Sequence, residues 1–168
     1  MTTFPLGGLI TLCVLLPNLL VFIAPPKNRL PENDLINEKK IKILTVVERI
    51  GQTGSFFLPF FYPIHINTPL QTAAFVVMAL ALLMYYAGWI RYLVLGRDES
   101  LLYRSMFMIP IPMAVFPVIY FLMASYILAS FWLFFAALLL GVGHISISWI
   151  NAQKVITEAE PINYKNKA

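Results

Sequence analysis

Long runs of apolar residues alternate with short polar segments along almost the whole chain. Five such runs cover residues 4–24, 48–66, 70–95, 106–126 and 129–151. A helix that spans the hydrocarbon core of a bilayer needs roughly 20 apolar residues, so each run has about the length of one crossing. The pattern predicts an all-α integral membrane protein, with a bundle of five transmembrane helices forming a single domain over residues 1–153. A polar cytoplasmic tail is predicted over residues 154–168.

The start of the second run is ambiguous. It falls between Thr45 and Ile50, and its position decides whether Glu48 is buried. Just before it, four apolar residues fall near helical spacing and charged residues occupy the other faces; the four are Ile36, Ile43, Leu44 and Val47. This spacing favours a short interfacial helix on the cytoplasmic side over residues 34–47. A solvated charged loop is an equally good interpretation of the same residues.

Prolines interrupt the first, second and fourth runs. Each removes a backbone donor and displaces the carbonyl four residues earlier, so the second and fourth helices are expected to bend. Bent helices can wall a cavity, although prolines are common in membrane helices and often only set the packing. The residues are Pro17, Pro59, Pro63, Pro110, Pro112 and Pro117.

Composition supports a membrane protein. Of the 168 residues, 60% are hydrophobic and 12% are charged, whereas soluble domains carry about 25% charged residues. The first positive charges, Lys27 and Arg29, follow the first apolar run instead of preceding it. A signal peptide has the opposite order, so this run is interpreted as a retained helix. Cys13 is the one cysteine, which excludes an internal disulfide.

Basic residues predict the orientation of the chain. In the five-crossing arrangement, all twelve lysines and arginines flank the first connection, flank the third connection or lie in the tail. Cytoplasmic loops carry the excess of positive charge, so the amino end is expected outside and the carboxyl end in the cytoplasm of a multi-pass plasma membrane protein. The net charge of +4 then matches anionic lipid headgroups, and no nucleic acid partner is expected.

Polar residues form stripes at helical spacing in several runs. His144, Ser148 and Asn151 are spaced by four and three residues, as are Glu48, Gln52 and Ser55, which puts each set on one face of a helix. The third run and the first add further polar groups, and most of these residues are expected in the cytoplasmic half of the bundle. The predicted ligand-binding residues are Glu48, Gln52, Ser55, Tyr85, Arg91, Tyr92, His144, Ser148 and Asn151, with Asn18 at similar depth.

His144 allows two interpretations. An ionisable residue within the bilayer is a candidate for ligand binding or proton handling, but a neutral histidine can equally serve as an interhelical hydrogen-bond partner. Glu48 and Arg91 are either charges at the membrane boundary or an ion pair that closes the cytoplasmic mouth. The sequence contains no GxSxG, HExxH, Walker or GxGxxG motif, so it specifies no catalytic residue, and neither a metal nor a cofactor is expected.

Three functions fit these features. The first is binding, with transport or sensing, of a small amphipathic molecule or lipid in the cytoplasmic half of the bundle. The second is a small lipid-modifying enzyme in which His144 is the general base and Arg91 holds a headgroup phosphate. The third is a non-catalytic subunit or assembly factor, whose partner is another membrane protein or a second copy of the chain.

Overall fold

The computed structural model describes residues 6–28 and 38–159, and these residues form helices joined by turns. No strand occurs in these two ranges, which confirms the predicted all-α class for them. The elements in chain order are α1 (Gly8–Asn18), α2 (Leu20–Ile23), α3 (Glu38–Phe57), the 3-10 turn η1 (Leu58–Phe61), α4 (Pro69–Val94), the 3-10 turn η2 (Glu99–Leu102), α5 (Pro112–Ile127) and α6 (Phe131–Ala159).

Two of these helices are long and apolar enough to cross a membrane. They are α4 and the segment Phe131–Thr157 of α6. The segment Gly8–Ile23 and α5 are also apolar but shorter. Length and composition therefore support two spans among the described residues, and the count of five crossings stays a prediction.

The second predicted crossing differs most from the structure. The region 38–47, for which an interfacial helix leading into this crossing and a charged loop were the two interpretations, is helical and continuous with the residues after it in α3, while residues 34–37 lie outside the described ranges. The helix ends at Phe57, short of the expected end at residue 66. Pro59 and Pro63 explain this early end, because each lacks the N–H that the next turn of helix would need.

The fourth predicted crossing begins six residues late, at Pro112 instead of residue 106. Met106 and Ile109 exchange backbone hydrogen bonds across a tight turn, and Ile111 has a positive φ of 43°. A residue that precedes proline is pushed out of the right-handed helical region. The Ile-Pro-Ile-Pro sequence therefore keeps residues 109–111 out of the helix. Residues 4 and 5 of the first run and 160–168 of the tail lie outside the described residues.

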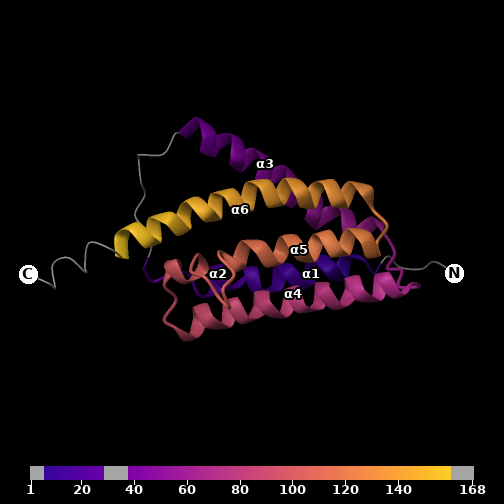
Figure 1. Cartoon of the computed structure of the whole chain (residues 1–168), viewed down its shortest axis with the longest axis horizontal. Coiled ribbons are helices and arrows are strands. Elements are labelled where there is room, and N and C mark those ends of the chain that lie inside the picture. The colour runs from indigo at the N-terminus through magenta and orange to yellow at the C-terminus, as the bar shows by residue number, and fades with distance from the viewer. Residues whose placement is uncertain (1–5, 29–37, 160–168) are drawn as a thin grey trace, which may run out of the picture.

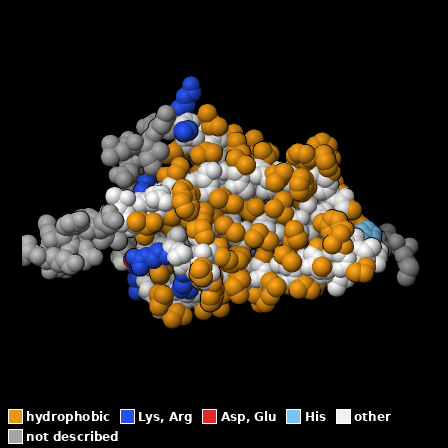
Figure 2. Space-filling model, viewed as in Figure 1, with side chains coloured by type: hydrophobic (Ala, Val, Ile, Leu, Met, Phe, Trp, Pro, Cys, Tyr) orange, Lys and Arg blue, Asp and Glu red, His pale blue; other side chains and the backbone are white. Residues whose placement is uncertain are grey.

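With α1 and α2 taken as one segment, the long helices run in alternating directions between the two ends of the bundle (Figure 1). At one end, the N–H of Lys27 donates to the carbonyl of Arg97 at 3.0 Å, and the Asn28 amide donates to Asp98 at 3.2 Å. At the opposite end, the N–H of His65 donates to the carbonyl of Ile127 at 3.4 Å. Figure 2 shows Lys and Arg side chains gathered at the end where α6 terminates, with hydrophobic side chains along the flank.

Tyrosine and threonine hydroxyls fix α1 to its neighbours. Pro17 has no N–H to offer the carbonyl of Cys13, four residues earlier, and the Tyr86 hydroxyl donates to that carbonyl at 2.9 Å. The helix break after Phe57 similarly leaves the carbonyl of Phe56 to accept from Thr11 at 2.9 Å. These bonds satisfy carbonyls that an apolar surrounding would otherwise leave unpaired.

The backbones of α3 and α6 approach closely through glycines. A Cβ added at Gly143 of α6 would lie 2.5–2.6 Å from the Cβ, Cα and N of Glu48, and one added at Gly51 of α3 would collide with the backbone of Leu140. Small residues permit such contacts between membrane helices, where van der Waals packing replaces the hydrophobic effect. This contact brings Glu48 and the residue after Gly143, which is His144, side by side.

Replacing Gly143 with alanine is expected to destabilise the protein by about 1–3 kcal/mol, because the added methyl overlaps the α3 backbone. Unfolding of the purified protein in mixed detergent micelles measures this change. Val142→Ala is the matched control, since Val142 is 58% exposed on the same helix, and should change stability by less than about 0.5 kcal/mol. Equal stability of Gly143→Ala and the wild type would contradict the close contact.

Candidate functional site

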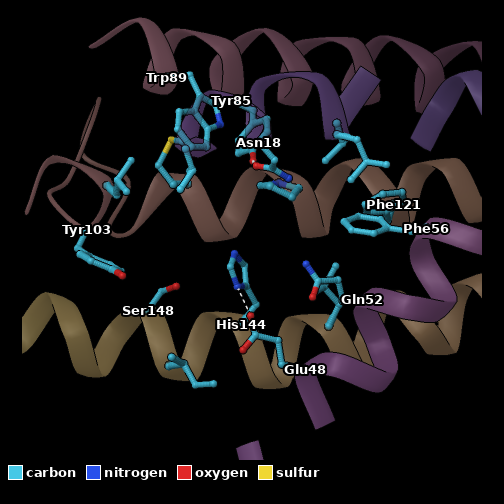
Figure 3. Close-up of a pocket in the computed structure, with 18 of the residues that line it drawn as sticks. Asn18, Glu48, Gln52, Phe56, Tyr85, Trp89, Tyr103, Phe121, His144 and Ser148 are labelled. Atoms are coloured by element: carbon cyan, nitrogen blue, oxygen red, sulfur yellow. Dashed lines mark hydrogen bonds and ion pairs between the residues drawn. The ribbon is translucent and has the colours of Figure 1, made fainter. Parts of the chain in front are cut away.

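A cavity of about 500 Å³ lies between the helices (Figure 3). It is bounded by α1, α2, α3, α4, α5 and α6, together with the segment that follows α4. Aromatic and aliphatic side chains form much of its wall. The polar residues that line it are Asn18, Glu48, Gln52, Tyr85, Tyr103, His144, Ser148 and Asn151.

Six of the nine predicted site residues line this cavity. They are Glu48, Gln52, Tyr85, His144, Ser148 and Asn151. They come from three helices, so the helical spacing within each run identified residues that the fold then brings together. Their role in binding stays a prediction. The other three, Ser55, Arg91 and Tyr92, do not line the cavity.

Glu48 and His144 form a hydrogen-bonded pair across α3 and α6. The Glu48 Oε1 atom lies 2.6 Å from His144 Nδ1. The His144 side chain is 35% exposed and the Glu48 side chain 18%, so the pair is accessible from the cavity. A carboxylate at this distance accepts the Nδ1 proton and fixes the orientation of the ring. The other ring nitrogen, Nε2, points away from Glu48 into the cavity (Figure 3).

Arg91 has a different role from the predicted pair with Glu48. Its guanidinium donates to the carbonyls of Leu101, Arg104 and Ser105, the last two at 2.9 Å. A planar guanidinium with several fixed donors suits this arrangement. Arg91 therefore holds the segment after α4 in place, and Glu48 pairs with His144 instead of with Arg91. The sequence could not show this, because the carbonyls that Arg91 binds belong to the short turn η2 and to the irregular segment after it.

Ser55 and Tyr92 are also buried away from the cavity. The Tyr92 hydroxyl donates to the carbonyl of Ala24 at 2.9 Å, which ties α4 to the end of α2. The Ser55 hydroxyl is fully buried without a hydrogen-bond partner among the described residues. The same stripe that contributes Gln52 to the cavity thus ends in the packed core at Ser55.

Asn18 and Tyr85 close the side of the cavity opposite His144 (Figure 3). The Tyr85 hydroxyl donates to Asn18 Oδ1, which leaves the amide nitrogen of Asn18 as a donor for a ligand. Because Oδ1 is already engaged, the amide has a defined orientation.

Tyr103 is the polar lining residue that sequence analysis missed. It follows η2 in a segment that the sequence predicts to be a polar connection. It lines the cavity because the hydrogen bonds of Arg91 hold this segment against the helices. Burial, and secondarily the negative charge of Glu99, raise the pKa of Tyr103. The phenol is therefore a protonated hydrogen-bond donor at neutral pH. The aromatic walls Phe22, Phe56, Trp89 and Phe121 were also outside the predicted set, since an aromatic residue in an apolar run is not distinctive.

Comparisons with known proteins identify no relative. The chain matches no protein-family model, no curated protein and no solved structure. Within residues 6–28 and 38–159, no three His, Cys, Asp or Glu side chains are grouped so that they could hold a metal ion. The proposed function therefore depends on the geometry of the cavity.

A double-mutant cycle on Glu48→Ala and His144→Ala is expected to give a coupling energy of about 0.6–1.7 kcal/mol, the range for hydrogen bonds between membrane helices. Unfolding free energies of the two single variants and the double variant measure it. A cycle that combines Glu48→Ala with His65→Ala is the control, because His65 is exposed near the opposite end. Additivity within about 0.3 kcal/mol in the first cycle would show that the pair contributes no coupling.

Proposed function

We propose that this protein is a multi-pass protein of the plasma membrane that binds a small amphipathic molecule or lipid in the cavity described above. The observation that carries the proposal is the composition of the cavity wall. One side offers the Glu48–His144 pair with Gln52 and Ser148, Asn18 and Tyr85 face this side from across the cavity, and aromatic and aliphatic side chains form much of the remaining wall. A molecule with a polar head and an apolar body has matching surfaces.

The exterior of the bundle supports a membrane location. Large apolar side chains on α4 and α6 are exposed along their lengths, including Leu80, Leu83, Trp132 and Val142. An apolar surface of this extent is costly in water. In the proposed arrangement, Gly8–Ile23, α4, α5 and α6 cross the bilayer, and α3 with η1 makes the remaining crossing after a charged first half that lies at the interface.

The distribution of charge supports the orientation with the amino end outside and the carboxyl end in the cytoplasm. Lysines and arginines gather at the end where α6 terminates (Figure 2), as the positive-inside rule requires of a cytoplasmic face. The cavity residues of α4, Tyr85 and Trp89, lie in the half of that helix nearer this end. A ligand would therefore be exchanged on the cytoplasmic side or with the inner leaflet.

The size of the cavity also supports a small ligand. Its volume of about 500 Å³ lies within the range of roughly 300–1,000 Å³ of small-molecule sites. Val14, Leu15, Val21 and Phe22 of the α1–α2 segment line it, and Phe22 is 83% exposed on its outer side. The acyl chain of a bound lipid could lie along this apolar segment while the head of the lipid binds at His144.

The Glu48–His144 pair also favours a second function, a lipid-modifying enzyme. A carboxylate on Nδ1 leaves Nε2 as a proton acceptor that faces the cavity, which is the arrangement of a general base. Under this proposal His144 removes a proton from water or from a ligand hydroxyl. The phosphate-binding role of Arg91 is not part of it, because Arg91 binds loop carbonyls.

Labelling of single cysteines tests the orientation. In a Cys13→Ala background, Asn67→Cys should react with a membrane-impermeant thiol reagent in intact cells, and Ser105→Cys should react only after the cells are opened. Both positions are exposed and lie on opposite connections. Labelling of Ser105→Cys in intact cells would contradict the proposed orientation.

Native mass spectrometry of gently extracted protein tests ligand binding. The wild type should retain a lipid or metabolite, and His144→Ala should reduce the retained fraction at least fivefold, because the cavity loses its ring acceptor. His65→Ala is the matched control and should retain the ligand. If a protein subunit replaces the small molecule, a structural role is favoured. Chemical modification of the ligand by the wild type but not by His144→Ala would favour the enzyme.

A further inference from the structure

The charge of the cavity indicates which class of amphiphile it accepts. We propose that the ligand carries an uncharged head with at least one hydroxyl group, as in a monoacylglycerol. This inference rests on the proposed binding function and adds the chemistry of the head. It is carried by the juxtaposition of the Glu48–His144 pair with neutral amide and hydroxyl groups on the same cavity.

An anionic head would meet an unfavourable environment. Glu48 lines the cavity, and its carboxylate is the negative group nearest to a head bound at His144. Among the residues that the structure describes, the lining contains neither lysine nor arginine. Arg91, the cation that the sequence suggested for binding a headgroup phosphate, instead donates hydrogen bonds from its guanidinium to three backbone carbonyls. A phosphate buried beside Glu48 would be repelled by its carboxylate and would lack a lysine or arginine to compensate its charge.

A cationic head is also disfavoured. The Glu48 carboxylate already accepts the Nδ1 proton of His144 at 2.6 Å, so its charge is partly satisfied within the pair. An ammonium group would find only the second carboxylate oxygen, Oε2, because Oε1 is already engaged by the imidazole. The remaining polar lining residues carry no formal charge; they are Asn18, Gln52, Tyr85, Tyr103, Ser148 and Asn151.

A hydroxyl head fits the donors and acceptors that remain. In the neutral tautomer whose Nδ1–H donates to Glu48, His144 presents Nε2 to the cavity as an acceptor, and a ligand hydroxyl can donate to it. A second hydroxyl of the head can accept from the Asn18 amide on the opposite side of the cavity, where the Asn18 oxygen already accepts from Tyr85. Gln52 lies beside His144 on the same cavity (Figure 3) and offers a further donor and acceptor. A head with two hydroxyls can use more of these groups than a head with one.

Four probes with the same oleoyl chain separate the alternatives. Delipidated protein in detergent is titrated with monooleoylglycerol, methyl oleate, oleoyl lysophosphatidic acid and oleoylcholine, and bound ligand is counted by native mass spectrometry. Monooleoylglycerol should bind at least tenfold more tightly than each of the other three. Tighter or equal binding of the lysophosphatidic acid, the choline ester or the methyl ester would overturn the assignment of the head.

Two variants locate the selectivity. His144→Phe should reduce the preference for monooleoylglycerol over methyl oleate to less than threefold. Glu48→Gln should reduce the ratio of the affinity for monooleoylglycerol to the affinity for the lysophosphatidic acid. His65→Phe is the control and should leave all four affinities unchanged. The wild-type comparison decides the proposal even if a variant fails to fold. Binding of none of the four probes would instead contradict the proposed binding function.

Discussion

The arrangement of the site depends on the contact between the backbones of α3 and α6. Gly51 and Gly143 leave no space for a side chain between the two helices, and this closeness is what allows Glu48 to reach His144. Helices in an apolar solvent gain little from burying apolar surface against one another, so close van der Waals contact and interhelical hydrogen bonds take over. At this contact both occur together: the glycines set the distance and the carboxylate–imidazole pair uses it.

Polar side chains elsewhere in the bundle mainly satisfy backbone groups. Tyr86 and Tyr92 of α4 donate to carbonyls of Cys13 and Ala24, and Arg91 donates to carbonyls of the loop after η2. An unpaired carbonyl in hydrocarbon costs several kcal/mol. These residues therefore hold α1, α2 and the loop around the cavity, whereas Glu48, His144 and Gln52 line the cavity itself. The distinction separates residues that support the cavity wall from residues that face the cavity.

Helical spacing within one run identified much of the candidate site. Residues on one face of a helix stay together in any fold, so Ser148 and Asn151 accompany His144, and Gln52 accompanies Glu48. The same spacing could not tell that Ser55 faces the core while Gln52 faces the cavity. The spacing also could not identify the hydrogen-bond partner of Glu48, because Arg91 and His144 are equally plausible partners until the rotation of each helix is known. Tyr103 lines the cavity because of the path of the segment after α4, and helical periodicity does not predict that path.

The sequence by itself determined the helical class, the apolar exterior and the stripes of polar residues, because these follow from composition and from the 3.6-residue repeat of the helix. The tertiary structure decided where the helices end, since the effect of Pro59, Pro63 and Pro112 depends on whether neighbouring groups satisfy the backbone. It also decided which polar groups meet. Differences of a few tenths of an ångström in the distance between two helices decide which side chains form hydrogen bonds across them. These distances are set only when glycines, prolines and loops are packed together.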